Sequence, residues 1–588
     1  MVEDDEDLDQ FVSFVKANPV LAFDTETTGL DIYSNRFRVR LAQFGNANES
    51  WVLPVERSAK ATWYAVNALR HAERLVIQNA SFDLAVVKQC WGIPFSETFS
   101  KTVDTKILAK LIDSRSVKVG GIGESLEDLT AHYIDKTTAD EVKSSMGNMA
   151  KRLRLSKGEL FSSISSRDPE YLLYSGMDAV LTYRLWQRLE PLVPIQSRSL
   201  IEFEHEVQRV CTQVSDHGYL LDLEYTRKLS AKLRATETRS VNTARSLGVE
   251  NVNSAEQVID AFKARGWLDF STTDKGSESA DKHVLEAALG SRDKEVAKLA
   301  KAVSEAKRAG KWRATWVDTF LESVDADGYC HPSIRTLQAR TGRMSITGIP
   351  AQTLPASEAS IRHCFLAEAG HVTLSTDYQA QELRVLAALS RDEVMLQAFR
   401  DGKDLHQVTA DAAGVSRKAG KGTNFAVVFG GGIRAIVEPF GVAPEEAAKA
   451  LKAFKATYLG VKKFSAQAQR QACIQGYVVS PSGRRLLIDK ERPYSATNAL
   501  VQSTARDVTC RGLLRLDAAG YSPYIRLPIH DEVVFSVPAE LEQEAASETN
   551  KLMQEEMVGL MISTEAEAQG RSWGSLYEDP GSNRKYVL

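Results

Sequence analysis

The sequence predicts a multidomain chain of α/β and α+β type, and three observations carry this prediction. The chain has 588 residues, which at roughly 100–200 residues per domain gives about three to five domains. Hydrophobic residues make up 43% and charged residues 26%, values that are typical of globular proteins and not of disordered or fibrous ones. Short apolar strand patterns occur near both ends of the chain, with long helical patterns between them. No apolar run reaches the roughly 18 residues that a membrane span needs.

The first third of the chain, residues 17–190, is predicted to be an α/β domain. Val20–Asp24 and Arg74–Gln78 are short apolar strand patterns, and longer helical patterns lie between them. Residues 195–325 then show a mainly helical and charged pattern. Small polar residues interrupt it at Asn251–Ser279, which we interpret as a loop-rich section.

The C-terminal part is predicted to be one sheet-based domain with a helical insertion. Strand-like runs occur at 372–376, 525–529 and 533–537. A long helical pattern from 380 to 475 lies between the first of these runs and the other two. Strands that are separated in this way can still pair in one sheet if the chain leaves the sheet, forms the inserted helices and then returns to it.

Charge is distributed unevenly along the chain, although the net charge is only −4. Residues 1–9 hold six acids and no base, which predicts a disordered tail and excludes a basic secretory signal, so the expected location is the cytoplasm. Residues 411–490 hold thirteen Lys/Arg against five Asp/Glu, which would suit a surface that faces phosphates. On charge alone, a solvated helical face is the favoured interpretation. Six scattered cysteines without a CxxC pair indicate buried thiols, not a disulfide framework or a zinc site.

Acidic residues from three predicted elements form a first candidate metal site. Asp24 and Glu26 alternate on a strand and therefore share a face. Asp83 follows the second strand, and Asp178 lies four residues after Tyr174 in a helical pattern, on the same helix face. Each acid alone is more often a capping or solvated residue. Together they could hold two hard divalent cations about 4 Å apart, a geometry suited to phosphoryl displacement.

A second acidic group is split between two distant segments. Asp377 ends a strand pattern, and Glu382 begins the following helical pattern. Far downstream, His530, Asp531 and Glu532 occupy the turn between two apolar strands. If these strands pair in one sheet, Asp377 and Asp531 meet at adjacent strand ends and could form a second two-metal centre.

A cationic and aromatic stripe lies between these two segments. Arg417, Lys421, Phe425 and Phe429 recur every four residues, which places them on one slowly drifting helix face. An ordinary amphipathic helix explains the spacing but not the combination of cations and aromatics. Two cations could bind a triphosphate, and Phe425 could stack against a base or sugar.

The first group resembles a known exonuclease family. DTETTGL (24–30), NASFD (79–83) and YSGMD (174–178) resemble the three motifs of the DEDD-type 3′→5′ exonucleases, in the proofreading version that has Tyr in the third motif. SLEDL (125–129) is similar to the helix that precedes the third motif. The resemblance implies an RNase H-like fold, the metal ligands Asp24, Glu26, Asp83 and Asp178, and Tyr174 as the residue that orients the attacking water.

The second group and the stripe resemble motifs A, C and B of the family A DNA polymerases. TGRMS (341–345), DLH (404–406), NALVQ (498–502) and the GxxxD pattern (218–222) are also similar to family segments. The resemblance implies a right-hand polymerase after the exonuclease domain. The expected domains are 1–190 (exonuclease), 191–330 (thumb and linking helices), 331–400 (first part of the palm), 401–475 (fingers) and 476–588 (second part of the palm).

Carried over residue by residue, the resemblance implies a role for each motif position. Asp377 and Asp531 would be the polymerase metal ligands, with Glu532 as a supporting acid. The dNTP-binding residues would be Arg417, Lys421, Phe425, Phe429 and His406, together with Glu382, which would exclude a ribose 2′-hydroxyl. The DNA-binding residues would be Arg343, Gln352, Asn498, Gln502 and His530. Two Mg²⁺ ions would serve each active site, and Mn²⁺ would also suit oxygen ligands.

Several positions depart from the family pattern. Phe429 stands where Tyr is usual, which removes a hydroxyl that commonly bonds to the gate acid. Pro350 and Thr353 replace two Asn that contact DNA. Ser503 and Arg506 replace small residues after Gln502. Arg506 is expected to contact a DNA phosphate or to form a surface salt bridge.

These observations predict a DNA polymerase that extends a primer with dNTPs and proofreads with a 3′→5′ exonuclease. Since the exonuclease motifs begin at residue 24, no 5′ nuclease domain precedes them, which is typical of a bacteriophage replicative enzyme in its bacterial host. The expected partners are primer–template DNA and dNTPs, with the chain acting as a monomer and any replisome or processivity factor unidentified. The alternatives are an exonuclease with an inactive polymerase half and a single-subunit RNA polymerase. A non-enzymatic replisome scaffold would leave both acid groups unexplained.

Overall fold

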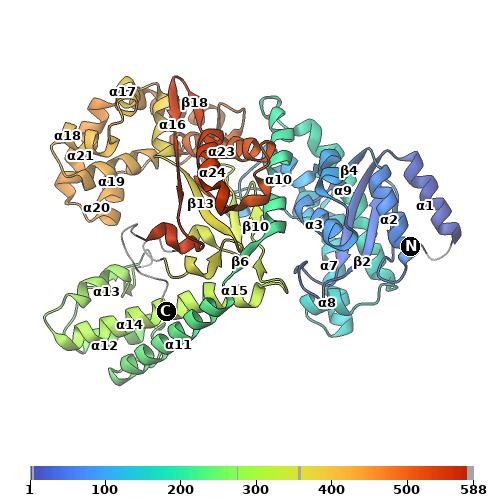
Figure 1. The fold of residues 1–588 in the computed structure, drawn as a ribbon, viewed down its shortest axis with the longest axis horizontal. Coiled ribbons are helices and arrows are strands. Elements are labelled where there is room, and N and C mark those ends of the chain that lie inside the picture. The colour runs from blue at the N-terminus through green and yellow to red at the C-terminus, as the bar shows by residue number, and fades with distance from the viewer. Residues whose placement is uncertain (1, 3–4, 274–275, 355–358, 579–588) are drawn as a thin grey trace.

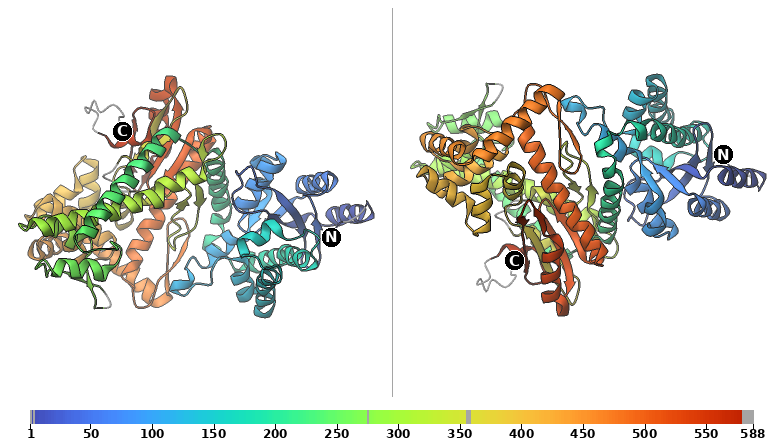
Figure 2. Two further views of the ribbon diagram at one scale, coloured as in Figure 1. Left: turned by 90° about the horizontal axis from the view of Figure 1, so that it is seen from below. Right: turned by 90° about the horizontal axis from the view of Figure 1, so that it is seen from above.

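The computed structural model describes the chain except for residues 1, 3–4, 274–275, 355–358 and 579–588 (Figure 1). An α/β domain occupies one end of the molecule, and a larger mixed region occupies the other. Helix α10 (Ser199–His217) lies between them in all three views (Figures 1 and 2). The order of elements is therefore the one that the sequence predicted.

The N-terminal domain is built on one five-stranded sheet. Its strand order is β3-β2-β1-β4-β5, with β1 and β2 antiparallel and β4 and β5 parallel to β1. The strands are β1 (Val20–Thr27), β2 (Val39–Gly45), β3 (Ser50–Leu53), β4 (Arg74–Ile77) and β5 (Thr102–Asp104). The main helices around it are α2 (Ala59–His71), α3 (Ala80–Trp91), α7 (Lys136–Leu153) and α9 (Pro169–Leu189). Both predicted strands are confirmed.

The prediction of a disordered acidic tail is wrong for the residues that the structure describes. Helix α1 runs from Asp5 to Ala17 and includes four of the six acids of this segment. Leu8, Phe11 and Phe14 are buried, and the Phe11 ring lies 5.5 Å from that of Phe44 on β2. The apolar residues recur at helical spacing and pack on the sheet, so burial of this face outweighs the charge of the other.

Two long helices dominate the region predicted as the thumb. These are α11 (Leu223–Ser246) and α14 (Lys294–Trp312), which pack along each other (Figure 1). The section 251–279, expected to be loop-rich, contains helix α12 (Ala255–Lys263). Val258 and Phe262 of α12 are buried in a small core with Val303 of α14, which explains why this segment is helical despite its polar flanks.

The region predicted as the palm is a four-stranded antiparallel sheet of order β16-β17-β13-β20. Its strands are β13 (His371–Tyr378), β16 (Ile525–Ile529), β17 (Glu532–Pro538) and β20 (Thr564–Ala568). Helices α23 (Ser495–Ala518) and α24 (Glu542–Met553) pack against each other, and α24 contacts the sheet. Strands far apart in the sequence therefore pair in one sheet, as predicted.

Seven helices follow β13 before the chain reaches α23 and the other strands of this sheet. They are α16 (Gln381–Ser390), α17 (Glu393–Arg400), α18 (Leu405–Ala413), α19 (Arg417–Val428), α20 (Arg434–Phe440), α21 (Pro444–Thr457) and α22 (Leu459–Gln475). Helices α17 to α21 extend from the same side of the sheet as the α11–α14 pair, away from the N-terminal domain (Figure 1).

All six cysteines are free thiols, but two of them, Cys90 and Cys473, are exposed and so differ from the prediction. Across the described residues, no helix combines the length and the apolar content that crossing a membrane would require.

Candidate active sites

Three carboxylates of the first predicted site converge where β1 meets α9. One ligand oxygen from each of Asp24, Glu26 and Asp178 lies within 4.8 Å of the others. Asp24 and Glu26 are alternate residues of β1 and share a face, while Asp178 reaches them from α9. Because hard divalent cations prefer several carboxylate oxygens, this donor set fits Mg²⁺ or Mn²⁺.

The fourth predicted acid lies beside this group but outside its 4.8 Å radius. Asp83, in the first turn of α3, uses one carboxylate oxygen (Oδ1) to accept hydrogen bonds from the Thr25 amide at 3.0 Å and the Thr25 hydroxyl at 2.6 Å. Thr25 lies between Asp24 and Glu26 and points to the opposite face of β1. Thr25 thus holds Asp83 against the strand that carries two of the other acids.

Burial raises the pKa of every acid in this site, and repulsion from nearby acids adds to it. Burial is the larger cause for each of them, and it raises the pKa of Glu26 to about 8 and those of Asp83 and Asp178 to about 7. For Asp24 the pKa is raised well above its ordinary value by burial and by the charges of Asp83, Asp178 and Glu26. Such a cluster of acids is unfavourable by itself and becomes favourable when a divalent cation neutralises it.

Two tyrosines of α9 contact these acids. Tyr174, which the sequence placed beside Asp178, hydrogen bonds to it and lowers its pKa against the effect of burial. Tyr171 was missed by the sequence analysis. Its hydroxyl donates to Glu26 at 3.3 Å in a buried setting. Tyr171 and Asp178 are seven residues apart on one helix, so the spacing could have indicated a shared face.

The second group of acids is assembled at one end of the palm sheet. Asp377 of β13 pairs in register with Glu532 of β17, so the two side chains project to the same face. The carbonyl of Asp531 accepts a hydrogen bond from the Tyr378 amide at 3.0 Å, which joins the β16–β17 turn to β13. His530 in this turn has a φ of 55°, a left-handed conformation that lets the chain reverse within two residues.

These acids also repel one another. The pKa of Asp377 is raised to about 8 by desolvation and then by the charges of Asp531 and Glu532. Burial raises the pKa values of Asp531 and Glu532 as well. Three carboxylates at one sheet end again fit a divalent cation by the chemistry of their donors.

The cationic and aromatic stripe is carried by α19, as predicted, except that Phe429 caps the helix end. Arg417 donates to Asp404 at 2.7 Å, and Lys421 is exposed one turn further along. The rings of Phe425 and Phe429 are stacked at 6.5 Å, and half of the Phe429 side chain is exposed.

His406 of α18 lies against this stripe. Its ring centroid is 5.8 Å from that of Phe425, and its Nδ1 lies 3.0 Å from the side-chain amide nitrogen of Asn424. Burial lowers the pKa of His406, and the charges of Arg417 and Lys421 lower it further, although Asp404 opposes them. The imidazole is therefore neutral near pH 7, and the two cations carry the positive charge of this surface.

Comparison with known proteins matches both halves of the chain. A family model described as DNA polymerase family A matches residues 223–575. The chain belongs to DNA polymerase family A. A second model, described as 3′-5′ exonuclease, matches residues 1–194. The chain is thus a DNA polymerase with a 3′-5′ exonuclease domain, and both activities belong to divalent-metal enzymes.

Relatives of this family A polymerase include phage and bacterial enzymes. The DNA polymerases of Mycobacterium phage L5 and Mycobacterium phage D29 are each 47% identical over 98% of this chain and 97% of their own length. DNA polymerase I of Pseudomonas aeruginosa is 27% identical over 94% of this chain and 63% of its own. The predicted resemblance to phage DNA polymerases is confirmed by the first two.

The fold also matches a solved structure, the POL domain of Pol1 from M. smegmatis in complex with DNA primer-template and dNTP. The TM-score is 0.78 at 20% identity, over 98% of this chain and 99% of that one. An RNase H-like exonuclease domain followed by a right-hand polymerase is therefore the fold of this chain.

Three of the predicted DNA-binding residues, Arg343, Gln352 and His530, line a small cavity together with Asp531. Arg343 forms an ion pair with Glu382, so this acid, predicted to exclude a 2′-hydroxyl, has a partner although Phe429 lacks a hydroxyl. The side-chain amide of Gln352 donates to the Met344 carbonyl at 3.0 Å and accepts from the Ile346 amide at 3.2 Å. These two hydrogen bonds hold the backbone of the 341–347 segment.

Two of the predicted DNA-binding residues, Asn498 and Gln502, lie on α23. Gln502 accepts a hydrogen bond from Thr341 at 3.4 Å. Within the described residues, the side-chain oxygen of Asn498 is buried and has no hydrogen-bond partner. The small cavity is lined by Arg343, Gln352, Glu382, Arg506, His530 and Asp531, which brings four distant segments together.

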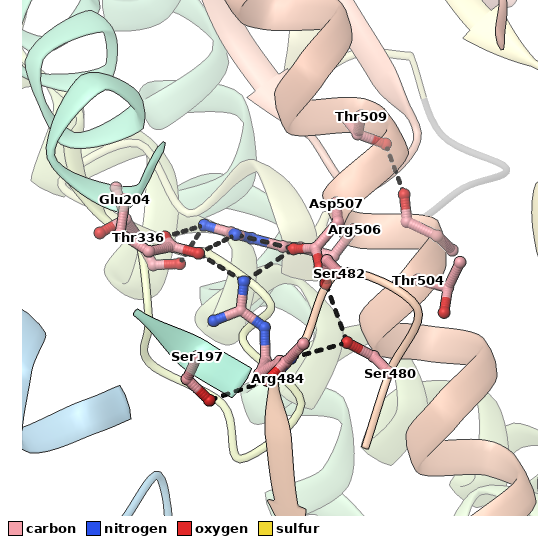
Figure 3. Close-up of polar contacts among 12 residues, drawn as sticks. Ser197, Glu204, Thr336, Ser480, Ser482, Arg484, Thr504, Arg506, Asp507 and Thr509 are labelled. Atoms are coloured by element: carbon pink, nitrogen blue, oxygen red, sulfur yellow. Dashed lines mark hydrogen bonds and ion pairs between the residues drawn. The ribbon is translucent and has the colours of Figure 1, made fainter. Parts of the chain in front are cut away.

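Both predictions for Arg506 are wrong, because this side chain is buried in an ion cluster (Figure 3). Its guanidinium donates to the two carboxylate oxygens of Glu204 on α10 at 2.6 and 2.7 Å and to Asp507 at 3.0 Å. Arg484 pairs with the same two acids. Burial alone would raise the pKa of Asp507, but Arg484 and Arg506 outweigh it and hold the pKa below its usual value.

Proposed function

We propose that the two acid groups are the two catalytic centres of this DNA polymerase, each holding two Mg²⁺ ions, with Mn²⁺ also accepted. The observation that carries the proposal is that acids from distant segments converge twice, once between β1 and α9 and once between β13 and the β16–β17 turn. Asp24, Glu26, Asp83 and Asp178 would hold the exonuclease ions. Asp377 and Asp531 would hold the polymerase ions, with Glu532 in support.

A bound divalent pair supplies charge neutralisation to both the attacking and the leaving oxygen of a phosphoryl transfer. The residues of the exonuclease site orient the reacting groups. Tyr174 hydrogen bonds to Asp178 and would orient the attacking water. Tyr171 and Thr25 fix Glu26 and Asp83, so that the acids keep their directions when a substrate enters.

The residues of the polymerase site bind and select the incoming nucleotide. Arg417 and Lys421 would bind the triphosphate, with neutral His406 donating one further hydrogen bond. Phe425 would stack on the base and sugar, with Phe429 beside it. Glu382, held by Arg343, would exclude a 2′-hydroxyl and so favour dNTPs over NTPs.

The DNA-binding residues would contact the primer–template minor groove, whose acceptors are shared by all base pairs. Arg343, Gln502, Asn498 and His530 would make these contacts, and Gln352 would act through the 341–347 backbone. We further propose that the enzyme replicates phage DNA in the cytoplasm of the bacterial host, acts as a monomer, and has as domains the ranges predicted from its sequence. No processivity factor is assigned.

One assay tests both centres. A labelled primer–template with Mg²⁺ is expected to be extended with dNTPs and shortened without them. Asp377→Ala should abolish extension and leave shortening, and Asp24→Ala should do the reverse. If Asp24→Ala shortened primers at the original rate, the exonuclease assignment would be wrong. Extension with NTPs as fast as with dNTPs would favour the RNA polymerase alternative.

A further inference from the structure

The segment Trp573–Glu578, the last one that the structure describes, contacts an acid of the proposed polymerase site. The hydroxyl of Tyr577 donates a hydrogen bond to Glu532 Oε2 at 3.2 Å. The hydroxyl of Ser375, on β13, donates to the other oxygen, Oε1, at 2.7 Å. Each oxygen of this carboxylate thus has its own hydroxyl donor, and the two donors come from different segments. Such a pair of donors sets the plane in which the carboxylate lies.

Tyr577 is held in place independently of Glu532. The guanidinium of Arg362 lies 4.1 Å from the centre of the Tyr577 ring and 5.2 Å from that of Trp573. Trp573 is 1% exposed and anchors the start of the segment. On the other side of Tyr577, Glu578 lies 3.1 Å from the Nε2 of His363. The Arg362 contact on the ring and the Glu578–His363 contact of the next residue therefore hold Tyr577, although this residue is 38% exposed, and its hydroxyl is presented to Glu532.

The orientation of the Glu532 carboxylate depends on such donors because other acids lie next to it. Glu532 pairs in register with Asp377 and follows Asp531 directly, so two acids lie beside it, while the charge of Arg362 opposes their repulsion. A carboxylate that repels its neighbours turns away from them unless other groups hold it. Ser375 and Tyr577 hold it from outside the acid group, which leaves Asp377 and Asp531 free to face the substrate.

We propose that Tyr577 is a positioning residue of the polymerase reaction, which acts by orienting the Glu532 carboxylate, and that the segment Trp573–Glu578 is part of the polymerase site. The match to the polymerase family model ends at residue 575, two residues before Tyr577. The inference rests on the assignment of Glu532 to the polymerase acids.

The first test removes one hydroxyl from the full-length chain. Tyr577→Phe is expected to lower kcat for dNTP addition by about 3- to 10-fold, the effect of one misplaced hydrogen-bonded acid. The KM for dNTP, the affinity for primer–template and the exonuclease rate should stay unchanged. Ser375→Ala removes the other donor from the same carboxylate and should lower kcat to a similar degree.

A matched control removes a tyrosine hydroxyl from another glutamate of the same domain. Tyr521 donates to Glu548 of α24 at 2.6 Å, outside the acid group. Tyr521→Phe should leave kcat within about two-fold of the wild type. An equal loss in the two tyrosine variants would show a general effect on the domain and would overturn the inference.

A double variant decides whether Tyr577 acts through Glu532. In a Glu532→Ala background, Tyr577→Phe should change the remaining kcat by less than about two-fold, because the group it orients is absent. A full multiplicative loss in the double variant would overturn the inference.

The outcome for Asp377→Ala distinguishes a failure of the polymerase-site assignment from a failure of the inference about Tyr577. If Asp377→Ala still extends primers, the polymerase assignment itself fails. If Asp377→Ala abolishes extension while Tyr577→Phe keeps the wild-type kcat, the inference about Tyr577 alone is overturned.

Discussion

Replacing Arg506 with Ala tests the buried ion cluster that the structure revealed. In the wild type, two arginines and two acids balance, and all four side chains are at most 4% exposed. Arg506→Ala leaves Arg484 to face both Glu204 and Asp507, which amounts to one uncompensated negative charge in the interior. Removing one partner of a buried ion pair costs about 3–5 kcal/mol. We expect the lower end, about 3 kcal/mol, because Arg484 still contacts both acids.

The assay is calorimetric unfolding of the polymerase half. In a large domain, 1 kcal/mol shifts Tm by about 2–4 °C, so about 3 kcal/mol lowers it by roughly 6–12 °C. Arg511→Ala is the matched control on the same helix. Arg511 pairs with Glu555 at 2.6 Å, but its side chain is 35% exposed, and the expected cost is about 1 kcal/mol or less.

A second substitution tests whether the surplus negative charge causes the loss of stability. Glu204→Gln added to Arg506→Ala removes the surplus charge and leaves Arg484 paired with Asp507, so the double variant should be more stable than Arg506→Ala alone. If Arg506→Ala cost no more than Arg511→Ala, or if Glu204→Gln destabilised the double variant further, the charge-balance reasoning would be refuted.

Three further outcomes follow from the sites. Tyr171→Phe should lower the exonuclease rate several-fold without changing extension, since it frees Glu26 in a buried site, and primer shortening measures this. Phe425→Tyr should increase dideoxynucleotide incorporation, and unchanged chain termination would contradict its place in the nucleotide site. Because the folded-state pKa values of Glu26, Asp83 and Asp178 are raised to about 8, 7 and 7, the metal-free exonuclease domain should lose stability as the pH rises from about 4 to 8. Mg²⁺ binds the ionised acids, so it should raise Tm more at pH 8 than at pH 5.5.

The sign of the last prediction follows from proton linkage. A carboxyl with a raised folded-state pKa binds more protons in the folded than in the unfolded protein between the two pKa values. Stability is therefore lost with rising pH in that window. A Mg²⁺ effect on Tm that is equal at both pH values would show that the ion does not bind at these acids.

The sequence was sufficient for the parts of the sites that depend on local spacing. Asp24 and Glu26 alternate on a strand, and Tyr174 and Asp178 lie one helical turn apart, so each pair could be placed on a shared face. The convergence of Asp377 with Asp531 required the sheet pairing, which two apolar strand patterns and a turn indicated. These predictions succeed because strand and helix periods fix side-chain directions over a few residues.

The parts that could not be predicted depend on partners far away in the chain. Arg506 was expected at the surface because its position on α23 resembled a DNA-facing one, yet its partner Glu204 is 302 residues away. No local pattern reports such a pair. The acidic segment before Phe11 was expected to be disordered because of its charge, but the apolar residues of this helix pack on the N-terminal sheet. The composition of the segment does not reveal that such an apolar surface is available in the folded domain.

One turn of α10 links the two catalytic domains through buried hydrogen bonds. On one side, Glu204 binds Arg506 of α23, the helix that carries Gln502. On the other, Gln208 donates to Asp104 at 2.6 Å, and the His205 imidazole accepts from the Asp104 amide at 2.7 Å.

Asp104 extends this link to the exonuclease site. Its carboxylate accepts the amides of Asn79 and Ala80 at 2.9 and 2.8 Å, and these two residues begin the helix that carries Asp83. Since Asn79 has a left-handed φ of 63°, these bonds hold a turn that the backbone would not adopt readily by itself. Each bond in the series is buried or partly buried and therefore costly to break, so the side chains of this turn help to set the position of Asp83 relative to α23.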